Sequence, residues 1–119
     1  MATKFPFGAA DVPTQEATTG ALSYEINNLK TFIKLSGLTG IVTAINLTIA
    51  DNIQAGAELI IEVVQGATGR NVAINGSTGF DSNVPDLTGV ANDVDVIRLE
   101  YDGSAFVATQ LWNKTVDAV

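Results

Sequence analysis

Apolar and polar residues alternate along much of this chain with a period of two, the spacing expected of β-strands with one buried face. From residue 41 to residue 50, one side of the alternation holds Ile41, Thr43, Ile45, Leu47 and Ile49. In residues 58–64, one side of the alternation consists of Leu59, Ile61 and Val63, and the other side includes Glu58 and Glu62. Both segments are predicted to be strands.

A β-hairpin is predicted near the C-terminal end. Asp102-Gly103 lies between residues 94–101 and 104–112, which are rich in β-branched and aromatic residues. Asp-Gly favours a two-residue type I′ loop, because both of its positions require positive φ. That loop predicts the cross-strand pairs Tyr101–Ser104, Leu99–Phe106 and Ile97–Ala108.

Residues 21–35 fit two patterns. Leu22, Ile26, Leu29 and Ile33 have helical spacing, but the same segment also alternates as two strands around Asn27-Asn28. The β-branched and aromatic character of residues 31–35 favours two strands, and a helix of one to three turns is the alternative.

A Gly-rich connection follows residue 64, and Val72 and Ile74 of residues 70–75 are predicted to continue the buried surface. Residues 76–89 form the longest predicted loop, anchored by Phe80, Val84 and Leu87. Short strands separated by Gly-rich turns at intervals of about ten residues predict an all-β fold, a small antiparallel β-sandwich or jelly-roll-like domain.

The N-terminal segment differs in composition from the rest. It contains two prolines, which disfavour helix and central strand, and two phenylalanines that flank one of them. We divide the chain into an extended N-terminal attachment arm, residues 1–20, and an antiparallel β domain, residues 21–119. A disordered leader is the alternative interpretation of the arm. Its candidate partner-binding residues are Phe5, Pro6, Phe7 and Val12.

Composition narrows the function. The 119 residues suit one domain, and the 46% hydrophobic content can supply its core. A net charge of −7 with only six Lys and Arg argues against nucleic acid and anionic membranes. There is no secretory signal pattern and no apolar run near the roughly 20 residues of a membrane-spanning helix, so no membrane insertion is expected.

Candidate chemistry is sparse. Without Cys or His, the chain lacks thiol catalysis and the commonest general base and metal ligand. Asp81, Asp86, Asp93, Asp95 and Asp102 could bind calcium with Asn83 and Asn92, but their spacing matches no EF-hand, and strand-terminating turns are the favoured interpretation. Two acids could hydrolyse a glycoside only at a defined separation, which a sequence does not supply. We therefore expect no enzyme activity, no cofactor and no metal.

Three residues are candidates for a glycan or interface contact. Trp112 lies near the end of its predicted strand, Asp95 near the start of another, and Phe80 in the long loop. Tyr101 and Phe106 fall on the predicted core face, so packing is their expected role.

From Gly56 onward the chain resembles β domains of tailed-bacteriophage virion proteins, such as tail fibres, head fibres and capsid decoration (cement) proteins. The resemblance covers about half of the chain, in residues 55–61, 71–74, 87–89, 95–103 and Phe106. It transfers no catalytic motif. The chain lacks the repetitive shaft of a tail fibre, which favours a capsid-attached protein.

The resemblance implies a non-enzymatic phage virion structural protein. The expected protein is a trimeric capsid decoration or short head-fibre protein at the virion surface, made in the bacterial host cytoplasm and bound through its arm to the major capsid protein or another virion protein. Some apolar residues are expected on the strand faces that point away from the domain's own core, and a homotrimer would bury them. They are Val42, Ile60, Val64, Val96, Val107 and Leu111. The alternative is a carbohydrate-binding receptor module of a tail fibre or tailspike, with a host surface glycan as partner.

Overall fold

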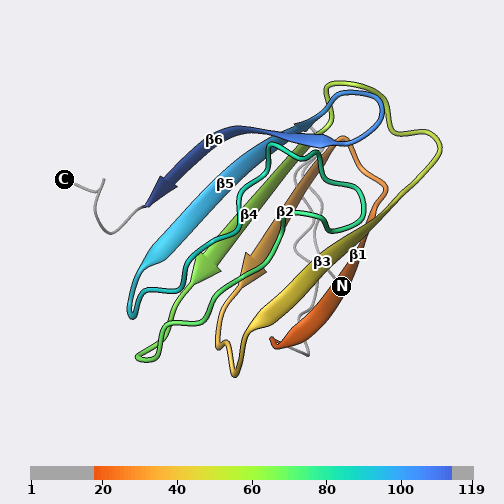
Figure 1. The fold of residues 1–119 in the computed structure, drawn as a ribbon. Coiled ribbons are helices and arrows are strands. Elements are labelled where there is room, and N and C mark those ends of the chain that lie inside the picture. The colour runs from red at the N-terminus through yellow and green to blue at the C-terminus, as the bar shows by residue number, and fades with distance from the viewer. Residues whose placement is uncertain (1–17, 114–119) are drawn as a thin grey trace, which may run out of the picture.

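The computed structural model describes residues 18–113 and shows an all-β protein. Its six strands are β1 (Gly20–Ile26), β2 (Lys30–Leu35), β3 (Val42–Ile49), β4 (Glu58–Val64), β5 (Val94–Tyr101) and β6 (Phe106–Asn113). They form a four-stranded sheet of order β2-β4-β5-β6 and a two-stranded sheet of β1 and β3 (Figure 1). The prediction of two strands rather than a helix in residues 21–35 is confirmed.

The prediction of a purely antiparallel domain is wrong. β1 pairs with β3 and β2 pairs with β4 in parallel, whereas the β4–β5 and β5–β6 pairs are antiparallel. The first four strands alternate between the two sheets, so each reverses direction relative to the one before. Strands that are two apart in sequence therefore share a sheet and a direction.

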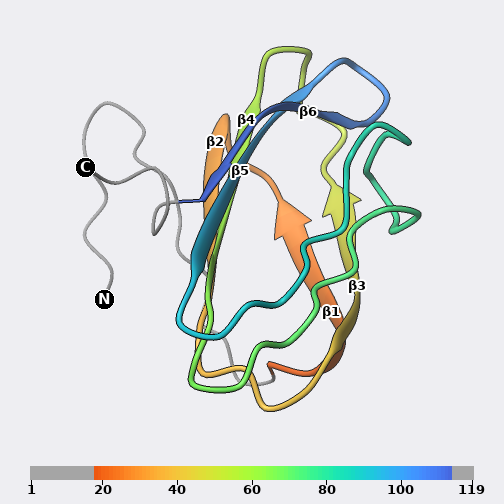
Figure 2. The ribbon, with the colours of Figure 1, turned by 60° about the vertical axis from the view of Figure 1, so that its left-hand side comes forward.

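The two sheets face each other across one core (Figure 2). β1 and β3 contribute Leu22, Ile26, Ile45 and Leu47, and the four-stranded sheet contributes fully buried residues such as Ile33, Leu35, Leu59, Ile61, Val63, Ile97 and Leu99. Tyr24 also lies in this core, and burial raises the pKa of its phenol to about 12.

A β-bulge at the start of β3 changes which residues enter the core. Gly20 pairs with Val42 but Ala21 pairs with Ala44, so Thr43 is an extra residue without a partner in β1. Val42 is consequently fully buried, and Ile41 is 56% exposed. The expectation that Val42 lies on a second, uncovered face is therefore wrong.

The C-terminal hairpin is confirmed, but its loop and register differ from the prediction. Tyr101 pairs with Phe106 and Leu99 with Ala108, so the loop is the four-residue segment 102–105. The Asp102 carboxylate accepts hydrogen bonds from the backbone N–H groups of Ser104 at 2.8 Å and Ala105 at 2.9 Å. These bonds stabilise the wider turn. The rings of Tyr101 and Phe106 stack at a tilt of 40°, with centroids 5.1 Å apart.

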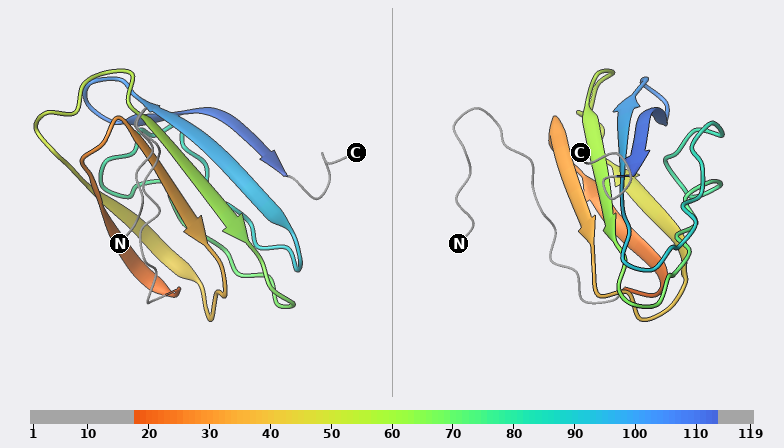
Figure 3. Two further views of the ribbon diagram at one scale, coloured as in Figure 1. Left: turned by 180° about the vertical axis from the view of Figure 1, so that it is seen from behind. Right: turned by 90° about the vertical axis from the view of Figure 1, so that its left-hand side faces the viewer.

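The connection between β4 and β5, residues 65–93, completes the layer formed by β1 and β3 (Figure 3). Val72 forms bridges with Val42 and with Leu87, so short extended pieces lie beside β3. Further along, Phe80 bridges to Phe106 of β6. The connection thus joins the second layer to the edge of the four-stranded sheet, and Val72, Ile74, Val84 and Leu87 are buried within it.

The body begins before the predicted domain boundary. The Thr18 hydroxyl donates a hydrogen bond to the Gly37 carbonyl at 2.8 Å, and the Gly20 N–H donates to the Ile41 carbonyl at 2.9 Å. Residues 18–20 therefore belong to the β domain rather than to the arm. The rest of the predicted arm lies outside the described residues.

We expect Ile61→Ala to lower the free energy of unfolding by about 2–5 kcal/mol, because it leaves a cavity beneath a central strand. The matched change Ile41→Ala removes the same atoms from an exposed position and should cost at most about 0.5 kcal/mol. Urea denaturation at one fixed protein concentration measures both. Equal losses would contradict this assignment of the core.

Candidate functional site

The outer face of the four-stranded sheet, turned away from the core, is the candidate functional surface. Its residues are set by the strand pairing, because side chains alternate between the faces of each strand. Three cross-strand rows run from β2 to β6: Lys30–Glu58–Glu100–Val107, Phe32–Ile60–Arg98–Gln110 and Lys34–Glu62–Val96–Trp112. Val64 and Val94 pair at the end of this face.

Charged side chains on the outer face pair across the strands. Glu58 forms ion pairs with Lys30, at 3.5 Å, and with Arg98. Glu62 lies 3.8 Å from Lys34. Lys30 and Arg98, which both pair with Glu58, offset the repulsion expected between Glu58 and Glu100, which lie directly opposite each other.

The outer face is neutral on a strongly acidic protein. Within residues 18–113, three cations on this face, Lys30, Lys34 and Arg98, balance three carboxylates, Glu58, Glu62 and Glu100. The chain as a whole carries −7. Two copies of the chain repel each other through their net charge, so this face is where they can approach with least electrostatic cost.

Apolar side chains fill the spaces between these ion pairs. Phe32, Ile60, Val64, Val94, Val107 and Trp112 are partly buried on this face. Val96 is only 6% exposed, although it does not belong to the main core cluster. Aromatic side chains and Arg, which this face contains, are enriched in protein interfaces, whereas Lys and Glu are depleted there.

Trp112 reaches the outer face because of a second β-bulge. Leu99 pairs with Ala108 but Arg98 pairs with Gln110, which leaves Thr109 as the extra residue. Beyond Thr109 the side chains exchange faces, so Trp112 pairs with Val96 on the outside. Leu111 was expected on a second strand face, but it pairs with Ile97 on the other side of the sheet from Trp112. Its side chain is 48% exposed there.

The three candidate contact residues are not brought together. Asp95 pairs with Asn113 on the opposite face of the sheet from Trp112, and its carboxylate accepts a hydrogen bond from the Asn113 side-chain amide at 2.8 Å. Phe80 lies beside Phe106, which pairs with Tyr101 at the other end of β5 from Asp95. Tyr101 and Asp95 are about six residues apart along that strand, so Phe80 is roughly 20 Å from Asp95. No single site includes all three, and an interface role of Trp112 stays a prediction.

Three aspartates of the second half, Asp81, Asp86 and Asp102, accept hydrogen bonds from backbone N–H groups. One Asp86 carboxylate oxygen accepts from the N–H groups of Ile74 and Asn75, both at 2.8 Å. Asp81 accepts from the Asn83 N–H at 3.0 Å. These bonds match the turn interpretation. Within residues 18–113 no group of three or more acidic side chains is arranged to hold a metal ion.

The remaining predicted contacts cannot be placed. Phe5, Pro6, Phe7 and Val12 lie outside the described residues. In the described part of the chain, no helix has the length and apolar character needed to cross a membrane.

Comparison with protein-family models, with curated proteins and with solved structures finds no match to this chain. The site is therefore interpreted from its own chemistry.

Sequence reasoning identified part of the outer face and missed the rest. It included Ile60, Val64, Val96 and Val107, but not Phe32 or the cross-strand ion pairs. The alternation of Lys30, Phe32 and Lys34 in β2 was a usable signal, whereas their neighbours depend on the strand order, which no local pattern gives.

The hydrogen bonds from the Ala105 and Ser104 N–H groups lower the pKa of Asp102 below its ordinary value of 3.8. Because the folded-state pKa is lowered, the turn's contribution to stability is present above pH 3.8 and is lost as the pH falls through the folded pKa. We expect an NMR titration of the carboxyl carbon to have its midpoint below 3.8. A midpoint at or above that value would show that the turn does not hold the carboxylate.

Proposed function

We propose that this chain is a non-enzymatic structural protein of a bacteriophage virion, a homotrimeric capsid decoration or short head-fibre protein. The carrying observation is the outer face of the four-stranded sheet, which combines apolar side chains with equal numbers of cations and carboxylates, most of them in ion pairs, on an acidic chain. Such a face suits packing against a like subunit. The corresponding fold is a small β-sandwich of jelly-roll-like type.

The proposed oligomer explains why charged residues and Trp112 share one face. Cross-strand ion pairs already satisfy Glu58 and Glu62 within the subunit, so an approaching subunit meets few unpaired charges. Burying an unpaired charge would be costly, whereas burying a paired one costs much less. Trp112 and Phe32 then supply the large apolar contacts that commonly dominate interface energies.

The proposed attachment site is the N-terminal arm, with Phe5, Pro6, Phe7 and Val12 as its contacts with the major capsid protein or another virion protein. An extended segment that becomes ordered on binding can cover a wide area of its partner, at a cost in affinity per unit area. The hydrogen bonds of Thr18 and Gly20 belong to the β domain, and substitutions at Phe5 and Phe7 leave both of those residues unaltered. The proposed location is the virion surface, after synthesis in the bacterial cytoplasm.

The oligomer is tested by light scattering on the full-length protein. We expect about three times the mass of one chain for the unaltered protein. Ile60→Asp adds a carboxylate at the centre of the outer face, opposite Arg98, which already pairs with Glu58; it should give a monomer, because burying the added ion costs several kcal/mol. The control Ile41→Asp changes an exposed residue of the other layer and should stay trimeric. A monomeric unaltered protein would reject the proposed interface.

Attachment is tested separately by co-sedimentation with capsids of the encoding phage that lack this protein. We expect the double change Phe5→Ser and Phe7→Ser to abolish binding while the mass in solution is retained. The matched double change Thr3→Ser and Thr14→Ser, in the same segment, should bind normally. Undiminished binding after loss of both phenylalanines would reject the arm as the attachment site. Absence of capsid binding by the unaltered protein would reject the decoration function.

A further inference from the structure

The long connection between β4 and β5 contains the one Asn-Gly pair of the sequence, Asn75-Gly76. The Ser77 N–H donates to the Ile74 carbonyl at 3.0 Å, so the pair occupies the two central positions of a β-turn. The φ angle of Gly76 is +82°, which is the conformation that a type II turn requires at its second central residue. The turn therefore requires a glycine directly after Asn75.

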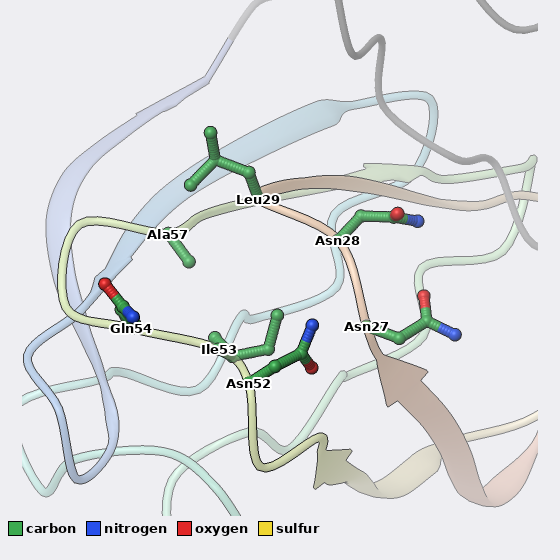
Figure 4. Close-up of a pocket in the computed structure, with 7 residues that line it drawn as sticks. All are labelled: Asn27, Asn28, Leu29, Asn52, Ile53, Gln54 and Ala57. Carbon is green, nitrogen blue, oxygen red and sulfur yellow. The ribbon is translucent and has the colours of Figure 1, made fainter.

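A glycine after asparagine also favours deamidation. In this reaction the backbone nitrogen of the following residue attacks the asparagine side-chain carbon, and glycine has no side chain to hinder that approach. Asn52 in the β3–β4 connection is followed instead by Ile53 (Figure 4), whose branched side chain hinders the same attack. Asn75 is thus the asparagine of this chain at which the reaction is chemically easiest.

The Asn75 side-chain amide is bound by two carbonyl groups of the loop that follows the turn. Its nitrogen donates to the Ser82 carbonyl at 2.9 Å and to the Val84 carbonyl at 2.6 Å. The backbone N–H of Asn75 donates to an Asp86 carboxylate oxygen at 2.8 Å. These three bonds fix the side chain and the backbone of Asn75, so the loop opposes the rotation that ring closure with Gly76 needs.

The loop held by Asn75 pairs with the edge of β6. The Phe106 N–H donates to the Gly79 carbonyl and the Asp81 N–H donates to the Phe106 carbonyl, both at 2.8 Å. The Asn83 side chain donates to the Ala108 carbonyl and accepts from the Ala108 N–H, both at 3.2 Å. The loop therefore covers the first half of this edge as a neighbouring strand would.

We propose that Asn75 is a deamidation site that folding protects and whose conversion releases this loop. The Gly76 nitrogen forms a bond to the Asn75 side-chain carbon, the bond from that carbon to the amide nitrogen breaks, and ammonia leaves with the Gly76 proton. Water then opens the cyclic imide to aspartate or isoaspartate. The new carboxylate has no N–H to donate to Ser82 and Val84, and it adds a second negative charge beside Asp86. This inference depends on neither the trimer nor the capsid attachment.

The protection is tested by incubating the full-length protein at mildly alkaline pH, folded and in guanidinium chloride, with peptide mass spectrometry to follow each asparagine. We expect Asn75 to convert about tenfold more slowly in the folded protein, the factor expected when two hydrogen bonds must break first. In the denatured chain Asn52 serves as the internal control and should convert much more slowly than Asn75.

The role of the loop is tested by Asp86→Ala, which removes the carboxylate that accepts from the Ile74 and Asn75 N–H groups. We expect conversion of Asn75 to become faster in the folded variant and to be unchanged in the denatured one. The control Asp51→Ala removes a carboxylate from an exposed position of the β3–β4 connection and should leave both rates as they were.

The release of the loop is tested by Asn75→Asp, which creates the aspartate product directly. Hydrogen exchange followed by NMR should show the backbone N–H groups of Asp81 and Ala108 exchanging about tenfold faster than in the unaltered protein. The control Asn52→Asp adds the same charge at another exposed position and should leave the exchange of both groups unchanged.

Three results would overturn the proposal. Equal conversion of Asn75 in folded and denatured protein would exclude the protection. An acceleration by Asp51→Ala as large as that by Asp86→Ala would exclude the loop as its cause. Exchange of Asp81 and Ala108 that is no faster in Asn75→Asp than in the matched control would exclude the release of the loop.

Discussion

One core shared by two sheets is the constraint on which the rest of this structure depends. A sheet of two strands is marginal by itself in water, so β1 and β3 hold their positions because Leu22, Ile26 and Ile45 pack against the four-stranded sheet. The chain crosses this core three times in succession between β1 and β4. The parallel pairs follow from that path, since each crossing reverses the chain.

In the long connection of residues 65–93, side chains form hydrogen bonds with backbone groups that the ladder of a regular sheet would otherwise pair. The buried Gln65 side chain donates to the Arg70 carbonyl and accepts from the Arg70 N–H, both at 2.8 Å. The buried Ser77 hydroxyl accepts from the Ile45 N–H at 3.1 Å. Buried backbone groups need such partners. Irregular backbone can therefore cover the core beside β3, and the layer does not require further strands there.

The outer face shows how weak interactions can still direct assembly. Exposed ion pairs contribute at most about 1 kcal/mol each to stability, so Lys30–Glu58 and Lys34–Glu62 are not what holds the sheet together. Their effect is electrostatic balance. Three of the four cations in residues 18–113 lie on this face, and most of the carboxylates of those residues lie elsewhere. In the proposed trimer, complementarity of this kind would favour one orientation of the subunits over others.

The sequence by itself determined the strands, because a period of two depends only on which residues are apolar. It located β3 to β6, favoured two strands in residues 21–35, and identified Phe80, Val84 and Leu87 as apolar anchors of the long loop. Phe106 was assigned to the core face for the same reason, and the two residues Asp102-Gly103 marked the hairpin. The candidate contacts were a weaker result: an exposed aromatic or acidic residue carries no local sign of its neighbours.

Only the tertiary structure decided strand order, direction and the two bulges. Parallel pairing of β1 with β3 results from contacts between residues far apart in sequence, which local propensity does not encode. The bulges at Thr43 and Thr109 each add one residue, and one residue exchanges every later side chain between faces. This is why Val42 is in the core and why Trp112 and Asp95 lie on opposite faces.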